Sequence, residues 1–129
     1  MQTQTLLVAV GGALGSVARY WLDGAVYRLL PATFPYGTFI VNVTGCLAFG
    51  LLIGVAGDRL TLGSPARALL LVGLLGGFTT FSSFAFETFT LARQAAWTLL
   101  VMNVGGQVLL GLLALWTGVV VGRTIGGAA

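Results

Sequence analysis

The segment GLLGGFTTFSSFAFETF occupies residues 73–89 and sets the main constraint on the fold. It is apolar enough for a membrane helix, yet it contains the pairs Gly76-Gly77 and Thr79-Thr80, which are poor helix formers together. If the surrounding span covers residues 66–92, its midpoint is residue 79. The pattern therefore predicts a third transmembrane helix that is broken near the midplane. An ordinary helix with a glycine groove is equally compatible with these residues.

The composition extends this interpretation to the whole chain. Of its 129 residues, 57% are hydrophobic and 7% are charged, whereas soluble proteins have about a quarter charged residues. A membrane-spanning helix needs roughly 20 apolar residues, so four helices use about 80 positions and leave no room for an extramembrane domain. We therefore predict an all-α membrane protein, a single integral membrane domain over residues 1–129. Its four transmembrane helices are expected at about 5–27, 36–57, 66–92 and 97–122.

Several classes of function are disfavoured by the same counts. The six basic residues are arginines spread along the chain, so no basic patch exists for nucleic acid. The chain has no histidine and one cysteine, Cys46, which excludes Cys/His metal clusters and an intrachain disulfide. Asp23 and Asp58 fall near span ends, and Glu87 lies about two turns from the third midpoint. With no acid pair and no nucleophile beside a base, the chain is not expected to be an enzyme.

Glycine spacing and arginine placement predict the assembly. Each predicted span contains two glycines four residues apart, a pattern that lets helices approach closely in lipid. These pairs are Gly11/Gly15, Gly50/Gly54, Gly73/Gly77 and Gly118/Gly122. Four short helices enclose little of a pathway alone, so we expect a dimer.

The arginine tally bears on orientation. Arg59, Arg67 and Arg123 lie on the predicted side of the chain ends, and Arg19, Arg28 and Arg93 lie on the other side. Because loop arginines bias insertion, equal counts predict dual topology and an antiparallel homodimer. A weak bias that fixes one orientation is the alternative.

The chemistry-bearing residues cluster around the predicted break. Phe81 and Phe84 share a helix face and alternate with the hydroxyls of residues 79, 80, 82 and 83. Electropositive ring edges and hydroxyl donors both suit a dehydrating anion, although core or lipid packing is the alternative. Asn42 offers an amide donor at similar depth. Asn103 and Gln107, one turn apart, fit either a polar path or hydrogen bonds between helices.

A helix break in lipid also frees backbone carbonyls. Irregular backbone at that depth is tolerated where it is buried in protein or lines a cavity, and freed carbonyls are ligands for a small cation. We therefore expect a metal ion on the symmetry axis, shared by two subunits.

Three motifs give the chain a resemblance to a known family. GGALGSVARY (residues 11–20), PYGTFIVNVTG (35–45) and GGFTTFSSFAFET (76–88) resemble the corresponding helices of the Fluc (CrcB) fluoride channels of microbes. The resemblance covers nearly the whole chain. It implies an antiparallel dual-topology homodimer in the cell inner (plasma) membrane, with two pathways that passively export cytoplasmic fluoride and so lower its toxicity.

The resemblance also implies roles for individual residues. Asn42, Phe81 and Phe84 would line the fluoride pore, and Arg19 would draw anions into a vestibule. The carbonyls of Gly76 and Thr79 would hold a structural Na⁺ at the dimer interface. The remaining polar path would consist of Thr38, Ser82, Ser83 and Glu87.

The fourth helix departs from the family pattern. Relatives usually place an aromatic residue or histidine there, followed by hydroxyls four and eight residues on, whereas this chain has Asn103, Gln107 and Gly111. We therefore expect the part of the polar path on the fourth helix to differ from that of the relatives.

Two other functions compete with the channel. A small dual-topology proton-coupled multidrug transporter also has four helices, but it needs a membrane-centred glutamate in its first helix. The corresponding stretch here, LVAVGGALGS (residues 7–16), has none. A non-conducting scaffold subunit would leave the break and the Phe/Ser/Thr stripe unexplained.

Overall fold

The computed structural model describes residues 1–57 and 64–127, and within them the chain is all-helical. Four helical stretches are long and apolar enough to cross a membrane: Gln2–Leu29, Tyr36–Ala56, Arg67–Arg93 and Trp97–Gly126. The predicted all-helical, multi-pass membrane architecture is confirmed at this level. The elements are α1 (Gln2–Leu29), α2 (Tyr36–Ala56), η2 (Arg67–Leu75), α3 (Gly76–Phe78), α4 (Phe81–Arg93) and α5 (Trp97–Gly126).

The third stretch is built from three pieces. η2 winds with the wider turn of a π-helix, and α3 continues it for three residues. Thr79 and Thr80 are then extended, with ψ angles of 158° and 112°, before α4 begins at Phe81. Thr80 caps α4, since its hydroxyl accepts a hydrogen bond from the Ser83 N–H.

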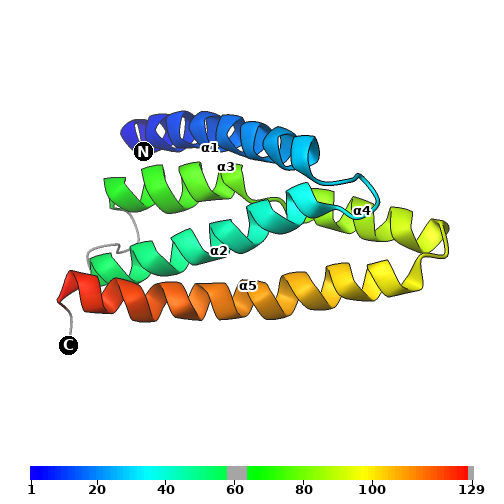
Figure 1. The fold of residues 1–129 in the computed structure, drawn as a ribbon. Helices are drawn as coiled ribbons and strands as arrows, with labels where there is room; N and C mark the ends of the chain where they lie inside the picture. Colours follow the sequence, from blue (N-terminus) through cyan, green and yellow to red (C-terminus); the bar gives the residue numbers. More distant parts are fainter. Residues whose placement is uncertain (58–63, 128–129) are drawn as a thin grey trace.

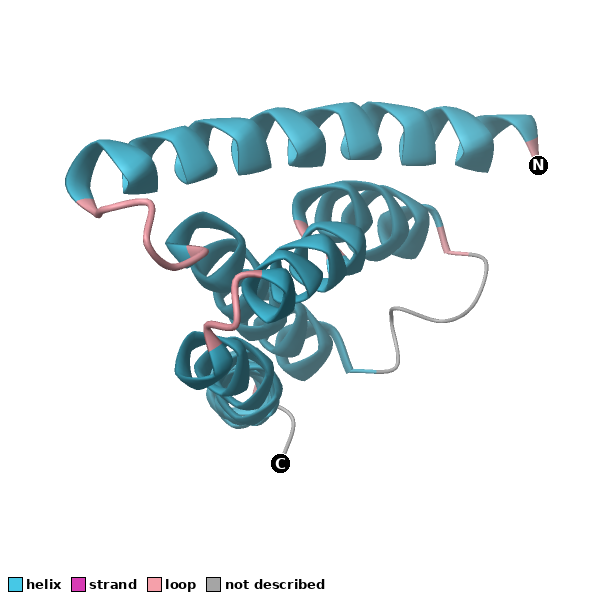
Figure 2. Cartoon of the chain, turned by 90° about the vertical axis from the view of Figure 1, so that its right-hand side faces the viewer, coloured by secondary structure: helices cyan, strands magenta, loops and turns pink. Residues whose placement is uncertain are grey.

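The helices form two closely packed pairs, as Figure 1 shows. α2 and α5 run side by side along their lengths, and α1 packs on η2 and α3. Figure 2 shows α1 from the side while the other helices are seen nearly end-on, so α1 crosses the bundle obliquely. α4 continues past the extended residues and contacts α5 and α2.

Glycines permit both close pairings. A Cβ at Gly11 or Gly15 would collide with the backbone of η2, at Leu69 and Leu74 respectively. Between α2 and α5, a Cβ at any of four glycines would lie within 3.0 Å of the facing backbone: Gly50, Gly54, Gly118 and Gly122. These glycine pairs therefore serve contacts within one subunit.

Outside these contacts, much of the apolar surface is uncovered. Large side chains on the outer face of α5, such as Leu109, Leu112 and Trp116, are exposed. Exposed apolar surface is the normal state of a helix that faces lipid tails or a membrane partner.

Gly77 offers a direct test of the packing between α1 and α3. A Cβ there would lie 2.5 Å from the Gly12 carbonyl oxygen and 3.0 Å from the Gly12 Cα. Gly77→Leu should therefore push the two helices apart and cost about 1–3 kcal/mol or more. In detergent, the temperature at which half of the protein aggregates should fall. Gly105→Leu is the matched control, because a Cβ at Gly105 meets nothing within 4 Å. Equal stability of the two variants would contradict this packing.

Candidate functional site

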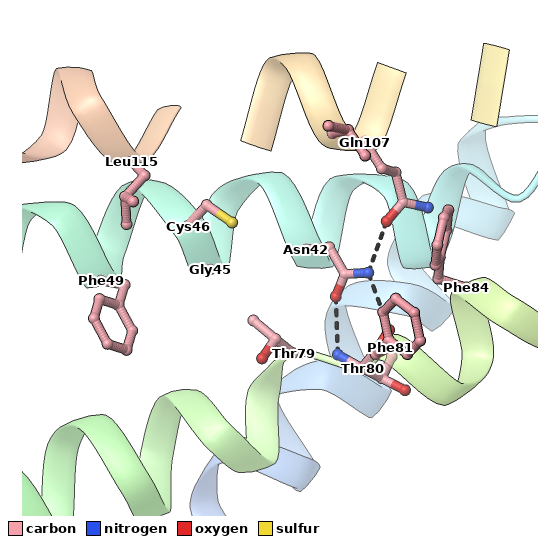
Figure 3. A pocket seen from close by; sticks show the side chains of 11 residues that line it. Asn42, Gly45, Cys46, Phe49, Thr79, Thr80, Phe81, Phe84, Gln107 and Leu115 are labelled. Atoms are coloured by element: carbon pink, nitrogen blue, oxygen red, sulfur yellow. Dashed lines mark hydrogen bonds between the residues drawn. The ribbon is translucent and has the colours of Figure 1, made fainter. Parts of the chain in front are cut away.

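The extended residues between α3 and α4 are held by a side chain of α2. The Thr80 N–H donates to Asn42 Oδ1 at 2.9 Å, and Asn42 Nδ2 donates back to the Thr80 carbonyl at 3.0 Å (Figure 3). The Asn42 amide thus replaces the backbone partners that Thr80 loses by leaving the helix. The backbone N–H and carbonyl of Thr80 are thereby both paired.

A line of hydrogen bonds continues from Asn42 across α5 to α4. Asn42 Nδ2 donates to Gln107 Oε1 at 2.7 Å, and Gln107 Nε2 donates to Asn103 Oδ1 at 2.9 Å. Asn103 Nδ2 then donates to Thr88 Oγ1 at 3.0 Å, and that hydroxyl donates to the Phe84 carbonyl at 2.7 Å. We call Asn42, Gln107 and Asn103 the amide chain. Asn103 is fully buried and Gln107 nearly so.

Beside the amide chain lies a groove of about 440 Å³, which we call the aromatic groove. The rings of Phe81 and Phe84 stand at its wall with centroids 5.5 Å apart and planes tilted by 52° (Figure 3). Phe81 is 78% exposed, so the rest of the subunit leaves most of its ring uncovered. None of the described residues that line this groove carries a charge. Its polar lining includes Asn42, Gln107, Thr79 and Thr80.

A second cavity, of about 460 Å³, is also lined in part by Thr80, and we call it the polar cavity. Here Thr38 Oγ1 donates to Glu87 Oε1 at 2.6 Å. The other carboxyl oxygen, Glu87 Oε2, is buried and has no hydrogen-bond partner within the described part of the chain. The polar cavity therefore places hydroxyl donors next to charged groups. Its main polar lining is Arg19, Asp23, Tyr27, Thr38, Ser83 and Glu87.

The carbonyls of Gly76 and Thr79 have lost their usual helical donors. In an α-helix the Gly76 carbonyl would accept from the Thr80 N–H, which here donates to Asn42. The Thr79 carbonyl would accept from the Ser83 N–H, which here donates to the Thr80 hydroxyl. Such carbonyls suit a hard cation. By contrast, residues 1–57 and 64–127 bring together no group of three His, Cys, Asp or Glu side chains that could hold a metal.

Comparison with known proteins identifies the family. The family described as "CrcB-like protein, Camphor Resistance (CrcB)" matches residues 6–119. The chain belongs to the CrcB family. It is 50% identical over 120 residues to the "Fluoride-specific ion channel FluC" of Nitratidesulfovibrio vulgaris (strain DSM 19637 / Miyazaki F). The matched region covers 93% of this chain and 97% of that protein.

Other CrcB relatives match over similar lengths. The protein of the same name from Magnetococcus marinus is 47% identical and covers 95% of this chain and 99% of its own. The one from Solidesulfovibrio magneticus is 46% identical and covers 92% and 94% respectively.

The residues singled out in this CrcB sequence divide between the two cavities. The aromatic groove receives Asn42, Phe81, Phe84 and Gln107, and the polar cavity receives Arg19, Thr38, Ser83 and Glu87. Ser82 lines neither space, and its hydroxyl lies 3.2 Å from the Thr80 hydroxyl. Asn103 is buried behind Gln107 in the amide chain. The expected role of Asn42 as a donor to an ion stays a prediction, because both of its N–H hydrogens already have acceptors here.

Sequence reasoning overlooked other residues of this CrcB site. Ser16, Tyr20, Asp23 and Tyr27 all line the polar cavity. Their spacing of four, three and four residues is that of one helix face, so periodicity could have found them. The hydrogen bond from Asn103 to the Thr88 hydroxyl had no comparable signal in the sequence pattern.

Proposed function

We propose that this CrcB protein is a passive, fluoride-selective anion channel that exports cytoplasmic fluoride and so lowers its toxicity. The observation that supports this most directly is the aromatic groove, where two phenylalanine rings stand beside amide and hydroxyl groups without a charged residue in the described lining. The names of the relatives, fluoride-specific ion channels rather than enzymes, point the same way.

The chemistry of the groove suits a small, strongly hydrated anion. Fluoride loses water only if close donors replace it, since transferring an ion into an apolar region is otherwise very costly. The ring edges of Phe81 and Phe84 are electropositive, and they lie next to polar groups of Asn42 and Thr80. Because conduction also requires that the ion leave, a lining without a fixed positive charge avoids trapping it.

The polar cavity completes the proposed pathway. Arg19 would raise the local anion concentration at a vestibule, since a positive charge in a recess attracts anions. Thr38, Ser83 and Glu87 would continue the polar path from there, with Ser82 beside it. Thr80 lines both cavities, so one extended residue borders each of the two spaces.

The channel is proposed to work as an antiparallel, dual-topology homodimer in the cell inner membrane. The aromatic groove is open, and the exposed Phe81 ring needs a cover that keeps water out. A second copy supplies it. The C-terminal ends of α1 and α4 lie at one end of the bundle, and the N-terminal end of η2 and the C-terminal end of α5 lie at the other (Figure 1). The terminal turns at the first end carry Arg28 and Arg93, and those at the second carry Arg67 and Arg123, which fits a chain without a strong orientation signal. Arg59 and Asp58 lie outside the described residues.

Added loop charges test this assembly. Two or three lysines placed in residues 30–35 and 94–96 should force one orientation. Fluoride efflux from cells should then be lost, because no antiparallel partner remains. Co-expression with a copy biased the opposite way should restore it. Normal conduction by one forced orientation alone would contradict the antiparallel dimer.

A structural Na⁺ is proposed at the dimer interface. Two carbonyls from each subunit, those of Gly76 and Thr79, would give it four oxygen ligands where the third span is broken near the midplane. The redirected Thr80 and Ser83 N–H groups support this assignment. Elemental analysis of protein purified in sodium-free buffer should find one sodium per two chains. Protein that is fully dimeric and sodium-free would remove the ion from the proposal.

The mode of transport is tested with liposomes loaded with potassium fluoride. Passive anion efflux builds an inside-positive potential, so rapid fluoride release should require a potassium ionophore. Equally fast release without the ionophore would contradict a channel. The rival multidrug transporter would instead exchange a lipophilic cation for protons. It lacks support here, since α1 contains no glutamate.

A further inference from the structure

We infer that Asn103 and Gln107 are positioning residues: they hold the first turn of α4, and with it the Phe81 and Phe84 rings, in place, and they are not ligands of the ion. The line of hydrogen bonds that runs through the amide chain begins just before this turn and ends on it. The chain starts at the Thr80 N–H, immediately before Phe81, and returns through Thr88 to the Phe84 carbonyl. The segment that carries both rings is therefore held by Asn42 at Thr80, just before Phe81, and by Asn103 at Thr88, one turn after Phe84. The inference rests on the proposed function for its effect on flux.

Within one subunit, side-chain packing alone fixes this segment poorly. Leu91, near the far end of α4, is the one buried residue of that helix. Phe81, Phe86 and Phe89 are all largely exposed. The extended residues Thr79 and Thr80 also interrupt the backbone hydrogen bonds that would join α4 to α3. Within the subunit, side-chain hydrogen bonds from α2 and α5 therefore hold the start of α4 in place of side-chain packing and of backbone bonds to α3.

The amide chain has one direction. Asn42 donates to Gln107, Gln107 donates to Asn103, and Asn103 donates to Thr88. An amide has separate donor and acceptor ends, so turning any one of them over would break the bonds on both its sides. Bonds aligned in this way also polarise and strengthen one another in a low dielectric. The chain is thus suited to hold one geometry, and a hydroxyl, which rotates freely, would not impose it.

Burial separates this role from ion binding. Asn103 is fully buried and lies outside the described lining of the aromatic groove. Gln107 does line the groove, but both polar atoms of its side chain already take part in the amide chain: the oxygen accepts from Asn42, and one of the two amide N–H hydrogens donates to Asn103. Removing the hydrogen bonds of either side chain should therefore make the Phe81 and Phe84 rings more mobile.

The test compares Gln107→Met and Thr88→Val with Thr90→Val. Methionine keeps the approximate length of glutamine and removes both hydrogen bonds. Thr88 and Thr90 each donate to the carbonyl four residues before them, but only the Thr88 hydroxyl accepts from the amide chain. Each variant carries 4-fluorophenylalanine at position 84, and its ¹⁹F resonance is recorded in fluoride-free detergent. Fluoride and chloride efflux are then measured in liposomes.

We expect Gln107→Met and Thr88→Val to shift or broaden the ring resonance. They should also lower fluoride efflux by about tenfold, a size of effect that is common when a functional side chain loses the hydrogen bonds that orient it. The ratio of fluoride efflux to chloride efflux should fall as well. Thr90→Val should change neither readout. The double variant Asn103→Leu/Gln107→Met should lower fluoride efflux no further than Gln107→Met does, because one missing side chain already interrupts the hydrogen bonds of the amide chain.

Two results would overturn the inference. One is an unchanged ring resonance in Gln107→Met together with reduced flux, which would make Gln107 an ion ligand. The other is additive losses in the double variant. Thr88→Val removes a single hydroxyl and gives the same test if Gln107→Met fails to fold. A native protein that does not conduct fluoride would contradict the proposed function, while the ring resonance would still decide the positioning role.

Discussion

Asn42→Asp should abolish measurable fluoride conduction. Aspartate lacks the N–H groups that Asn42 donates to the Thr80 carbonyl and to Gln107 Oε1, so it would place a carboxylate oxygen against two acceptors. It also adds a negative charge to the lining of the aromatic groove. Two like charges about 4 Å apart repel by about 4 kcal/mol at an effective dielectric constant of 20. That alone corresponds to a loss of nearly a thousandfold.

Asn42→Leu separates the two causes. Leucine removes the same hydrogen bonds and adds no charge, so it should reduce fluoride efflux from liposomes less than Asn42→Asp does. Thr44→Val is the control for a polar change on the same helix, since the Thr44 hydroxyl bonds only carbonyls of its own helix, Ile40 and Val41. Fluoride efflux within a factor of about two of native in Asn42→Asp would remove Asn42 from the pathway.

The second large effect is expected at the aromatic pair. Phe81→Ile and Phe84→Ile keep apolar bulk and remove the electropositive ring edges. Each should lower fluoride efflux by about tenfold or more, equivalent to about 1.4 kcal/mol. The dimer should remain intact, as judged by its elution volume in detergent.

Phe89→Ile is the matched control for this pair. Phe89 lies on the same helix and is also exposed, but it is not part of the described lining of the groove. Its replacement should leave efflux close to native. Equal losses in all three variants would show that any phenylalanine on α4 matters only for packing.

The sequence alone predicted the four spans, because long apolar runs leave few alternatives. The first and the last helix extend beyond the predicted bounds, however. α1 begins at Gln2 where residue 5 was predicted, and α5 continues to Gly126 where residue 122 was predicted. Backbone hydrogen bonding continues through polar residues, so hydropathy marks the apolar part of a helix and not its ends.

Other features could not be predicted because they depend on distant residues. The wide winding of η2 has no local sequence signal that we recognise. Asn103 and Gln107 are one turn apart, so their mutual bond was foreseeable. The bond between Asn42 and Gln107 joins residues 65 apart, and that between Thr38 and Glu87 joins residues 49 apart. Only the packing of α2 against α5 and α4 brings these pairs together.

Asn103 and Gln107 had two possible roles on sequence grounds. Their depth in the fourth span fitted both a polar path and hydrogen bonds between helices. The structure shows bonds to α2 and α4 from these two side chains. These bonds are the basis of the inference that the two residues support the path and do not bind the ion.

The most direct test of the central claim is fluoride efflux from liposomes that contain the purified native protein. A fluoride electrode records efflux after a potassium ionophore is added, and a chloride electrode records chloride under the same gradient. The account predicts rapid fluoride release, far slower chloride release, fluoride release lowered by about tenfold or more in Phe84→Ile, and loss of the fluoride signal in Asn42→Asp. Fluoride release no faster than from protein-free liposomes, or equal release of the two anions, would contradict it.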